Sequence, residues 1–247
     1  MPEPRLRTVQ KYKPPYPLNK FPDNFVQILA EEFVHFLATN STPNLEGNRW
    51  EEIFAKAVGA AWKPSNVGLD DIVLEQTAWG AKSVKSAAPH TSKSVRLISG
   101  RNSPIFSYGE RSISKAEPDV LGAKILEIFN ERVAGIRALY RHVRTVVLIK
   151  SLNLSSFTVF EFETAMYPPE MFIWKWNAND NLEGFDKDGD SHRFTWQPHG
   201  SQFTIVEPVP ADALRFRLVK TPEKLDKAAV LKTVGFAKDW IEIVRNP

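Results

Sequence analysis

Cysteine is absent from this chain of 247 residues. Its absence excludes disulfide bonds, thiolate metal sites and cysteine nucleophiles, so any bound metal ion must have oxygen or histidine ligands. The five histidines stand at positions 35, 90, 142, 192 and 199 and show neither His-x-Glu nor His-x-x-x-His spacing. A zinc hydrolase is therefore not expected.

Long apolar runs are also missing. No stretch approaches the roughly 20 consecutive apolar residues that cross a bilayer, and the N-terminal residues 1–5 lack the apolar run of a signal peptide. We therefore expect a cytoplasmic protein. Glycine-rich phosphate-binding loops are not found either.

The excess of one charge sign is small, with a net charge of +3, and this value alone does not indicate a nucleic-acid partner. The distribution of charge is more informative. One stretch almost free of acids contains a group of basic residues, namely Lys82, Lys85, Lys93, Arg96 and Arg101. Such a local basic surface suits a groove that receives phosphates.

The hydrophobic content of 43% is enough for one good core. Residues 1–22 contain six prolines and are predicted to form an extended arm outside that core. Apolar spacing predicts helices at residues 25–37, 50–58, 118–144 and 222–244. Short apolar runs predict strands at residues 68–75, 78–86, 95–99, 146–149, 157–162, 172–176, 193–196, 202–206 and 214–219.

The order of these elements indicates the α/β class, in its α+β form with a central mixed β-sheet flanked by helices. Three regions follow one another: the arm at residues 1–22, a core at residues 23–152, and a β-rich, aromatic region with a C-terminal helix at residues 153–247. We expect the last two regions to be continuous as one domain.

Acidic and basic side chains of the predicted core have the order of a phosphodiesterase site. Glu51 lies on the second helix, Asp71 lies at the start of a strand, and Lys82 and Lys85 lie on the neighbouring strand. Divalent ions held by carboxylates, together with a lysine, activate water and offset the charge that develops on a phosphodiester. A protein without cysteine suits a hard ion with oxygen ligands.

Residues 47–51, 71–74 and 79–86 resemble the PD-(D/E)XK nuclease core of type II restriction endonucleases, and residues 96–103 would form the next strand and its exit loop. The resemblance implies a restriction-endonuclease-like fold, Mg²⁺ as cofactor and double-stranded DNA as substrate. It also implies a glutamate from the first core helix, an aspartate from a hairpin and a lysine from the partner strand, which here are Glu51, Asp71 and one of the two lysines.

The resemblance is incomplete beside the lysine. The residues two positions before Lys82 and Lys85 are Gly80 and Ser83, so neither lysine has the acidic partner of the motif. In an alternating strand the two lysines point to opposite faces, so only one is expected to be catalytic. The number of residues that separate Asp71 from each lysine favours Lys85 as the catalytic one, and Lys82 stays the alternative.

The missing acid is expected from elsewhere in the core. Glu75 shares a strand face with Asp71 by the two-residue alternation, and Glu51 or Glu52 on the second helix is the other source. The predicted metal ligands are therefore Asp71, Glu75 and Glu51.

Side chains suited to base edges and phosphates lie near the third strand and on the hairpins of the C-terminal half. Those predicted to bind DNA are Lys93, Arg101, Asn102, Lys175, Asn177, Arg193, Gln197, His199 and Gln202. The aromatic residues that alternate with them are predicted to form a sheet core rather than a stacking surface for bases.

The expected function is that of a site-specific, Mg²⁺-dependent DNA endonuclease that restricts foreign DNA. A palindromic site favours a two-fold homodimer, for which the helix at residues 118–144 and the N-terminal arm are both candidate contacts. Two alternatives stay open: a repair or recombination nuclease of the same fold, and a non-catalytic DNA-binding protein in which Asp71 and the lysines are structural.

Overall fold

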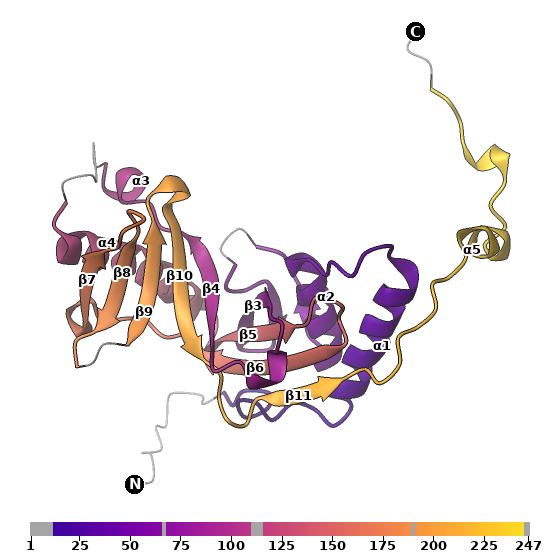
Figure 1. Ribbon diagram of the computed structural model, residues 1–247, viewed down its shortest axis with the longest axis horizontal. Helices are drawn as coiled ribbons and strands as arrows, with labels where there is room; N and C mark the ends of the chain where they lie inside the picture. The colour runs from indigo at the N-terminus through magenta and orange to yellow at the C-terminus, as the bar shows by residue number, and fades with distance from the viewer. Residues whose placement is uncertain (1–11, 66–67, 110–115, 189–190, 245–247) are drawn as a thin grey trace.

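The computed structural model describes residues 12–65, 68–109, 116–188 and 191–244, which form two β-sheets with helices against them (Figure 1). The strand order is β1-β2-β3-β5-β6-β11 in the first sheet and β4-β10-β9-β8-β7 in the second. The mixed α/β class, with a mixed sheet flanked by helices, is confirmed.

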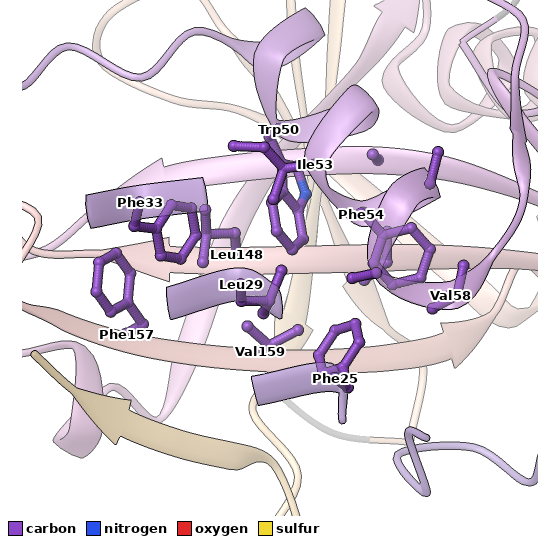
Figure 2. Packing of buried hydrophobic residues seen from close by; sticks show 14 of the residues in the cluster. Phe25, Leu29, Phe33, Trp50, Ile53, Phe54, Val58, Leu148, Phe157 and Val159 are labelled. Carbon is purple, nitrogen blue, oxygen red and sulfur yellow. The ribbon is translucent and has the colours of Figure 1, made fainter. Parts of the chain in front are cut away.

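The first sheet contains β1 (Ala61–Trp62), β2 (Ile72–Leu74), β3 (Thr77–Lys85), β5 (His142–Lys150), β6 (Ser156–Glu163) and β11 (Leu214–Arg217). β3 and β5 are parallel, and the other neighbours are antiparallel. Helices α1 (Phe25–Thr39) and α2 (Gly47–Val58) cover one face of this sheet. Figure 2 shows the core between them, in which Phe33, Trp50 and Phe54 pack over Leu148 and Val159.

The second sheet is antiparallel throughout and contains β4 (Ser94–Arg101), β7 (Phe172–Trp176), β8 (Leu182–Asp186), β9 (His192–Gln197) and β10 (Gln202–Pro208). Helix α4 (Pro118–Leu139) packs on it so closely that a Cβ atom on Gly122 would lie 2.3 Å from the Trp174 ring. Val95 and Leu97 of β4 form a third apolar cluster with Val147 and Ile149 of β5. β4 therefore joins the two sheets.

Short elements complete the description. They are α3 (Pro104–Tyr108), α5 (Lys227–Thr233) and 3-10 turns at Pro89–Thr91, Pro169–Met171, His199–Ser201 and Lys238–Trp240. Among the described residues, the helices include none that combines the length and apolar character required to cross a membrane.

Several predicted boundaries are wrong. The helix expected at residues 118–144 ends at Leu139, because Tyr140 is extended (φ −126°, ψ 139°), and β5 begins at His142. The strand expected at residues 95–99 is β4, which pairs with β10 and belongs to the second sheet instead of following β3 in the first. Two strands of the predicted recognition region, β6 and β11, complete the first sheet.

The two ends of the chain also differ from expectation. The predicted helix at residues 222–244 is reduced to α5, which lies away from the body and is exposed except for the half-buried Leu231 (Figure 1). Without a surface to cover its apolar side, a longer helix gains little from packing. The predicted arm is partly core: Tyr16 is buried against Trp79, and its hydroxyl donates to Glu161 at 2.9 Å. Residues 1–11 lie outside the described range.

Candidate nuclease site

Asp71 and Lys82 face each other across the β2–β3 hairpin. Asp71 precedes β2 directly and is 4% exposed, and the pairing of Ile72 with Trp79 places it beside Gly80 on the neighbouring strand. Trp79 and Ala81 point into the core under α1 and α2. Since side chains alternate along a strand, Lys82 lies on the opposite face, toward the second sheet.

The turn before β2 brings the two side chains together. Lys82 Nζ lies 3.7 Å and Asp71 Oδ2 4.0 Å from the position that a Cβ atom on Gly68 would occupy. The two charged atoms therefore cannot be farther apart than the sum of these distances. Lys82 Nζ also donates a long hydrogen bond of 3.4 Å to the Gly68 carbonyl oxygen, and the Ser65 backbone N–H donates to Asp71 Oδ1 at 2.9 Å.

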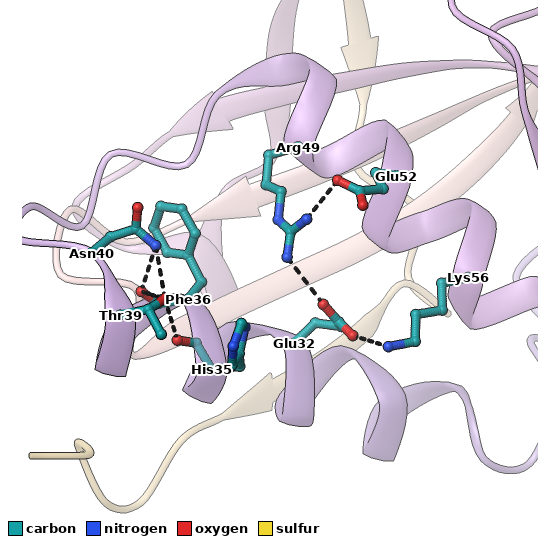
Figure 3. A network of polar contacts seen from close by, with 8 residues as sticks. All are labelled: Glu32, His35, Phe36, Thr39, Asn40, Arg49, Glu52 and Lys56. Carbon is teal, nitrogen blue, oxygen red and sulfur yellow. Dashed lines mark hydrogen bonds and ion pairs between the residues drawn. The ribbon is translucent and has the colours of Figure 1, made fainter. Parts of the chain in front are cut away.

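Glu51 reaches the same place from α2. On the outer side of this helix, Glu32 of α1 pairs with Arg49 and with Lys56 (Figure 3). Glu51 points elsewhere, toward β1, where Trp62 Nε1 donates to its Oε2 at 3.2 Å. Among the described residues, no hydrogen bond to its other carboxylate oxygen is found.

The charges of the three groups act on one another. Burial raises the pKa of Glu51, the hydrogen bond from Trp62 opposes this rise, and the charge of Asp71 adds to it while Lys82 lowers it. Burial lowers the pKa of Lys82, and the carboxylates of Asp71 and Glu51 oppose that shift. The fold thus brings Glu51, Asp71 and Lys82 near enough for their charges to interact, and their role in one catalytic site stays a prediction.

Gly80 stands at the position where the motif of the predicted resemblance has an acid. A Cβ atom at this position would lie 2.7 Å from the Gly68 carbonyl oxygen and 3.1 Å from the Leu69 Cα atom. The turn of residues 68–69 thus fills the space in which an acidic side chain at position 80 would begin. The groups left there are the Gly68 carbonyl oxygen and the carboxylates of Asp71 and Glu51.

The donor set fits Mg²⁺ better than a metal that needs a complete protein cage. Within the described ranges, no group of three or more acidic, histidine or cysteine side chains could hold a metal ion. Mg²⁺ is commonly held by one or two carboxylates, with water and substrate phosphates in the remaining positions. Asp71 and Glu51 supply two carboxylates, each with one oxygen that accepts a hydrogen bond from the protein.

Comparisons of the chain with protein-family models, curated proteins and solved structures gave no match. The functional conclusion therefore depends on the geometry of the site itself, since a fold class alone does not specify an activity.

Two predicted catalytic residues lie elsewhere. Lys85 is on the α1–α2 face of β3, where its Nζ donates to Asn44 Oδ1 at 3.0 Å, so the preference for Lys85 over Lys82 is wrong. Glu75 is exposed in the turn between β2 and β3 with φ of +51°, which breaks the alternation that was expected to align it with Asp71. The structure thus gives Glu75 no place beside Asp71 as a metal ligand.

Three residues predicted to bind DNA gather at the tip of the second sheet. Arg101, His199 and Gln202 line one hollow of about 510 Å³, together with Ile98, Gly100 and Gly200. Gln197 joins them through a hydrogen bond from Gln202 Nε2 at 3.1 Å. This hollow lies at the C-terminal end of β4, which neighbours β3 of the first sheet.

Asn102, Asn177 and Arg193 all have partners within the protein. The complete burial of Asn102 contradicts its predicted role in DNA binding, whereas the roles of the half-buried Asn177 and Arg193 stay predictions. Asn102 is fully buried and bonds Ile125 O and Arg132. Asn177 closes the β7–β8 turn, with its Oδ1 accepting from two backbone N–H groups. Arg193 pairs with the buried Glu207 at 3.7 Å.

Lys93 and Lys175 are exposed but distant from the hollow along their strands. Lys93 directly precedes β4, and Arg101 is the eighth and last residue of this strand. At about 3.4 Å per residue this is a separation of roughly 25 Å. Lys175 lies on the far strand β7, with its Nζ over the Phe185 ring.

A different hollow of about 490 Å³ lies by α1 and α2, next to the network of Figure 3, and includes His35, Asn44 and Arg49 in its lining. None of Glu51, Asp71 and Lys82 lines it, and Arg49 is already paired with Glu32 and Glu52. It carries no catalytic arrangement that the sequence predicts.

Sequence reasoning missed Arg132 of α4. Burial is the main cause of the lowered pKa of Lys82, and the charge of Arg132 adds to it. The carboxylates of Asp71 and Glu51 act in the opposite direction. No motif marks this residue in the sequence, because its contacts with Ser99 and Asn102 join segments about 30 residues apart.

Proposed function

We propose that this protein is a site-specific, Mg²⁺-dependent double-strand DNA endonuclease of the PD-(D/E)XK type that restricts foreign DNA. The observation that carries the proposal is the convergence of Asp71 and Lys82 on Gly68, within 4.0 Å of one point, with Glu51 close enough to alter the pKa of Lys82. These are the residue types that phosphodiester hydrolysis requires.

Each residue has a distinct role in the proposal. Asp71 and Glu51 would hold Mg²⁺, which would supply Lewis acidity toward the phosphate and a lower pKa for bound water. Lys82 lies beside them on β3 with its ammonium directed toward the turn at Gly68. There it stabilises the negative charge that builds on the phosphate oxygens and orients the attacking water.

DNA is read by the hollow at the tip of the second sheet. Arg101 and His199 are exposed there, Gln197 and Gln202 are half-buried, and all four can donate or accept hydrogen bonds at base edges. The hollow and the catalytic group are linked by β4, so one duplex contacts both. A palindromic site requires two copies of the chain, and we propose a cytoplasmic homodimer.

The test is incubation of purified protein with supercoiled plasmid and Mg²⁺, compared with the same reaction in EDTA. Wild-type protein is expected to give discrete fragments only with Mg²⁺, and Asp71→Ala is expected to give none. A circular-dichroism spectrum of the variant controls for folding.

Other outcomes select other functions. Smearing or nicking at many sites would replace restriction by a repair or recombination nuclease. Binding without cleavage would replace it by a DNA-binding protein, a result that the lack of a three-acid cluster among the described residues would then explain.

A further inference from the structure

Two polar side chains in the hollow at the tip of the second sheet come from neighbouring strands. Arg101 is the last residue of β4, Gln202 is the first residue of β10, and the two are direct partners in the antiparallel pairing. Directly opposed residues of such a pair have Cα atoms about 4.5–5.5 Å apart. Both residues line the hollow of about 510 Å³. The pair thus presents two different hydrogen-bonding groups to one space.

The guanidinium of Arg101 is available to a ligand. Arg101 is exposed, and within the described ranges its side chain forms neither an ion pair nor a hydrogen bond. A guanidinium carries five N–H donors in a planar fork and no acceptor. Two parallel donors of this fork match the O6 and N7 acceptors on the major-groove edge of guanine. Arg101 is therefore suited to guanine more than to the other bases.

The backbone that carries Arg101 is held on both sides. The backbone N–H of the following residue, the fully buried Asn102, donates to the Ser201 carbonyl oxygen at 2.8 Å. Arg132 Nη2 donates to Asn102 Oδ1 and to the Ser99 carbonyl oxygen, each at 2.7 Å. A side chain on a backbone that is already fixed loses less conformational freedom on binding. Arg101 is thus preorganised to contact a ligand in the hollow.

The amide of Gln202 is held by its neighbour Gln197. Gln202 Nε2 donates to Gln197 Oε1 at 3.1 Å, and in the part of the chain that the structure describes its side chain has no other hydrogen bond. One amide N–H and the carbonyl oxygen of Gln202 are left for a ligand. A donor beside an acceptor is the combination that pairs with N7 and N6 of adenine. Gln202 is therefore suited to adenine.

We propose that this hollow reads two neighbouring base pairs in the major groove, with Arg101 on a guanine and Gln202 on an adenine. The inference rests on the proposed function, because it names the bases that the DNA-reading hollow selects. Stacked base pairs are about 3.4 Å apart, so side chains from two directly opposed residues can reach adjacent pairs. The major groove distinguishes all four base pairs, so these contacts select a sequence and not only a charge.

The test is a selection of bound sequences from random DNA duplexes, performed with wild-type protein in EDTA so that no strand is cut. The recovered sequences are expected to share a guanine next to an adenine. Arg101→Ala is expected to lower the preference for the guanine by roughly tenfold or more and to keep the adenine. Gln202→Ala is expected to do the reverse. Because each variant keeps one of the two preferences, a misfolded protein is distinguished from a loss of base reading.

Two further variants separate base reading from attraction to phosphate. Arg101→Lys keeps the positive charge without the planar fork, and is expected to lose most of the guanine preference while binding keeps its salt dependence. Lys93→Ala is the matched control, since Lys93 is exposed directly before the same strand and lies outside the hollow. It removes the same charge and is expected to leave the recovered sequence unchanged.

Three results overturn the inference: recovered sequences that lack this guanine and adenine, an Arg101→Ala variant that binds every sequence more weakly by the same factor, and an equal loss of preference in Lys93→Ala. The selection needs no cleavage. A protein that binds this pair of bases and cuts no DNA therefore supports the inference and overturns the proposed function. Cleavage at sites without the pair supports the proposed function and overturns the inference.

Discussion

The carbonyl oxygen of Gly68 lies 2.7 Å from the place where a Cβ atom of residue 80 would stand, so these two glycines pack backbone to backbone. The turn of residues 68–69 occupies the position from which the motif's second acid would project. The acid that the proposed PD-(D/E)XK assignment would require at position 80 is therefore absent where a turn fills its place.

Gly80→Ala is expected to destabilise the protein by about 1–3 kcal/mol, because the new methyl group forces the backbone of the turn to move. Gly135→Ala in α4 is the control, since a Cβ atom there would meet nothing within 4 Å. Replacing glycine by alanine inside a helix is expected to stabilise by roughly 0.5–1 kcal/mol. Urea unfolding measures both, and equal stability of the two variants would contradict this packing.

Gly80→Asp, which restores the motif, is expected to lower cleavage for the same reason.

Lys82→Met is expected to reduce the single-turnover rate of DNA cleavage by about 100-fold or more, because a charge beside the reacting phosphate is lost. Lys85→Met is the matched control on the same strand: its ammonium bonds Asn44 on the other face. The control is expected to cut at nearly the wild-type rate. An equal loss of cleavage rate in the two variants would indicate that both lysines act only by attracting the DNA through their charge.

Arg101 and Asn102 are adjacent in sequence and opposite in role. Arg101→Ala is expected to weaken DNA binding and to reduce the salt dependence by about one ionic contact, with no loss of stability. Asn102→Ala is expected to cost about 1–3 kcal/mol of unfolding free energy, since Ile125 O and Arg132 lose their partner. Thermal unfolding and a binding titration at two salt concentrations separate the effects. A destabilised Arg101 variant would contradict the assignment.

The buried Glu161 is expected to make stability depend on pH. Burial raises its pKa to about 7, although Arg144 at 3.3 Å opposes the shift. Between the ordinary pKa of a glutamate and about 7, the folded state holds a proton that the unfolded state has lost. Stability therefore falls as pH rises through this window, by at most about 1.4 kcal/mol per pH unit.

Glu161→Gln is expected to flatten the pH profile of the unfolding free energy between about pH 5 and pH 7. This window lies between the ordinary pKa of a glutamate and the raised pKa of Glu161. Glu163→Gln is the control, because Glu163 also contacts Arg144 but is substantially exposed. The control is expected to keep the slope of the wild type. A slope that survives in Glu161→Gln would assign the titration to another group.

Local patterns in the sequence predicted much of the fold. The apolar spacing of Phe25, Leu29 and Phe33 marks α1 correctly, and the hairpin that joins Asp71 to Lys82 follows from two adjacent apolar runs. These features depend on residues close in the sequence. The helix position of Glu51 and the hairpin positions of Asp71 and Lys82 follow from the same local patterns, and their catalytic role stays a prediction.

The rest depends on contacts that a single sequence does not reveal. β4 pairs with β10, about 100 residues farther along, so its place in the second sheet could not be read from its own residues. The positive φ of Glu75 depends on the turn that closes β2 on β3. The burial of Asn102 and the approach of Arg132 both come from the packing of α4, and neither residue differs in type from an exposed one.

The central claim is that Glu51 and Asp71 hold one divalent ion beside Lys82. Titration of the protein with Mn²⁺, with the free ion measured by electron paramagnetic resonance, tests it most directly. Wild type is expected to bind Mn²⁺, and Asp71→Asn and Glu51→Gln to weaken binding by about tenfold or more. Glu52→Gln should bind as the wild type does, because Glu52 pairs with Arg49 on the outer side of α2. Unchanged Mn²⁺ binding in Asp71→Asn and Glu51→Gln would contradict the account.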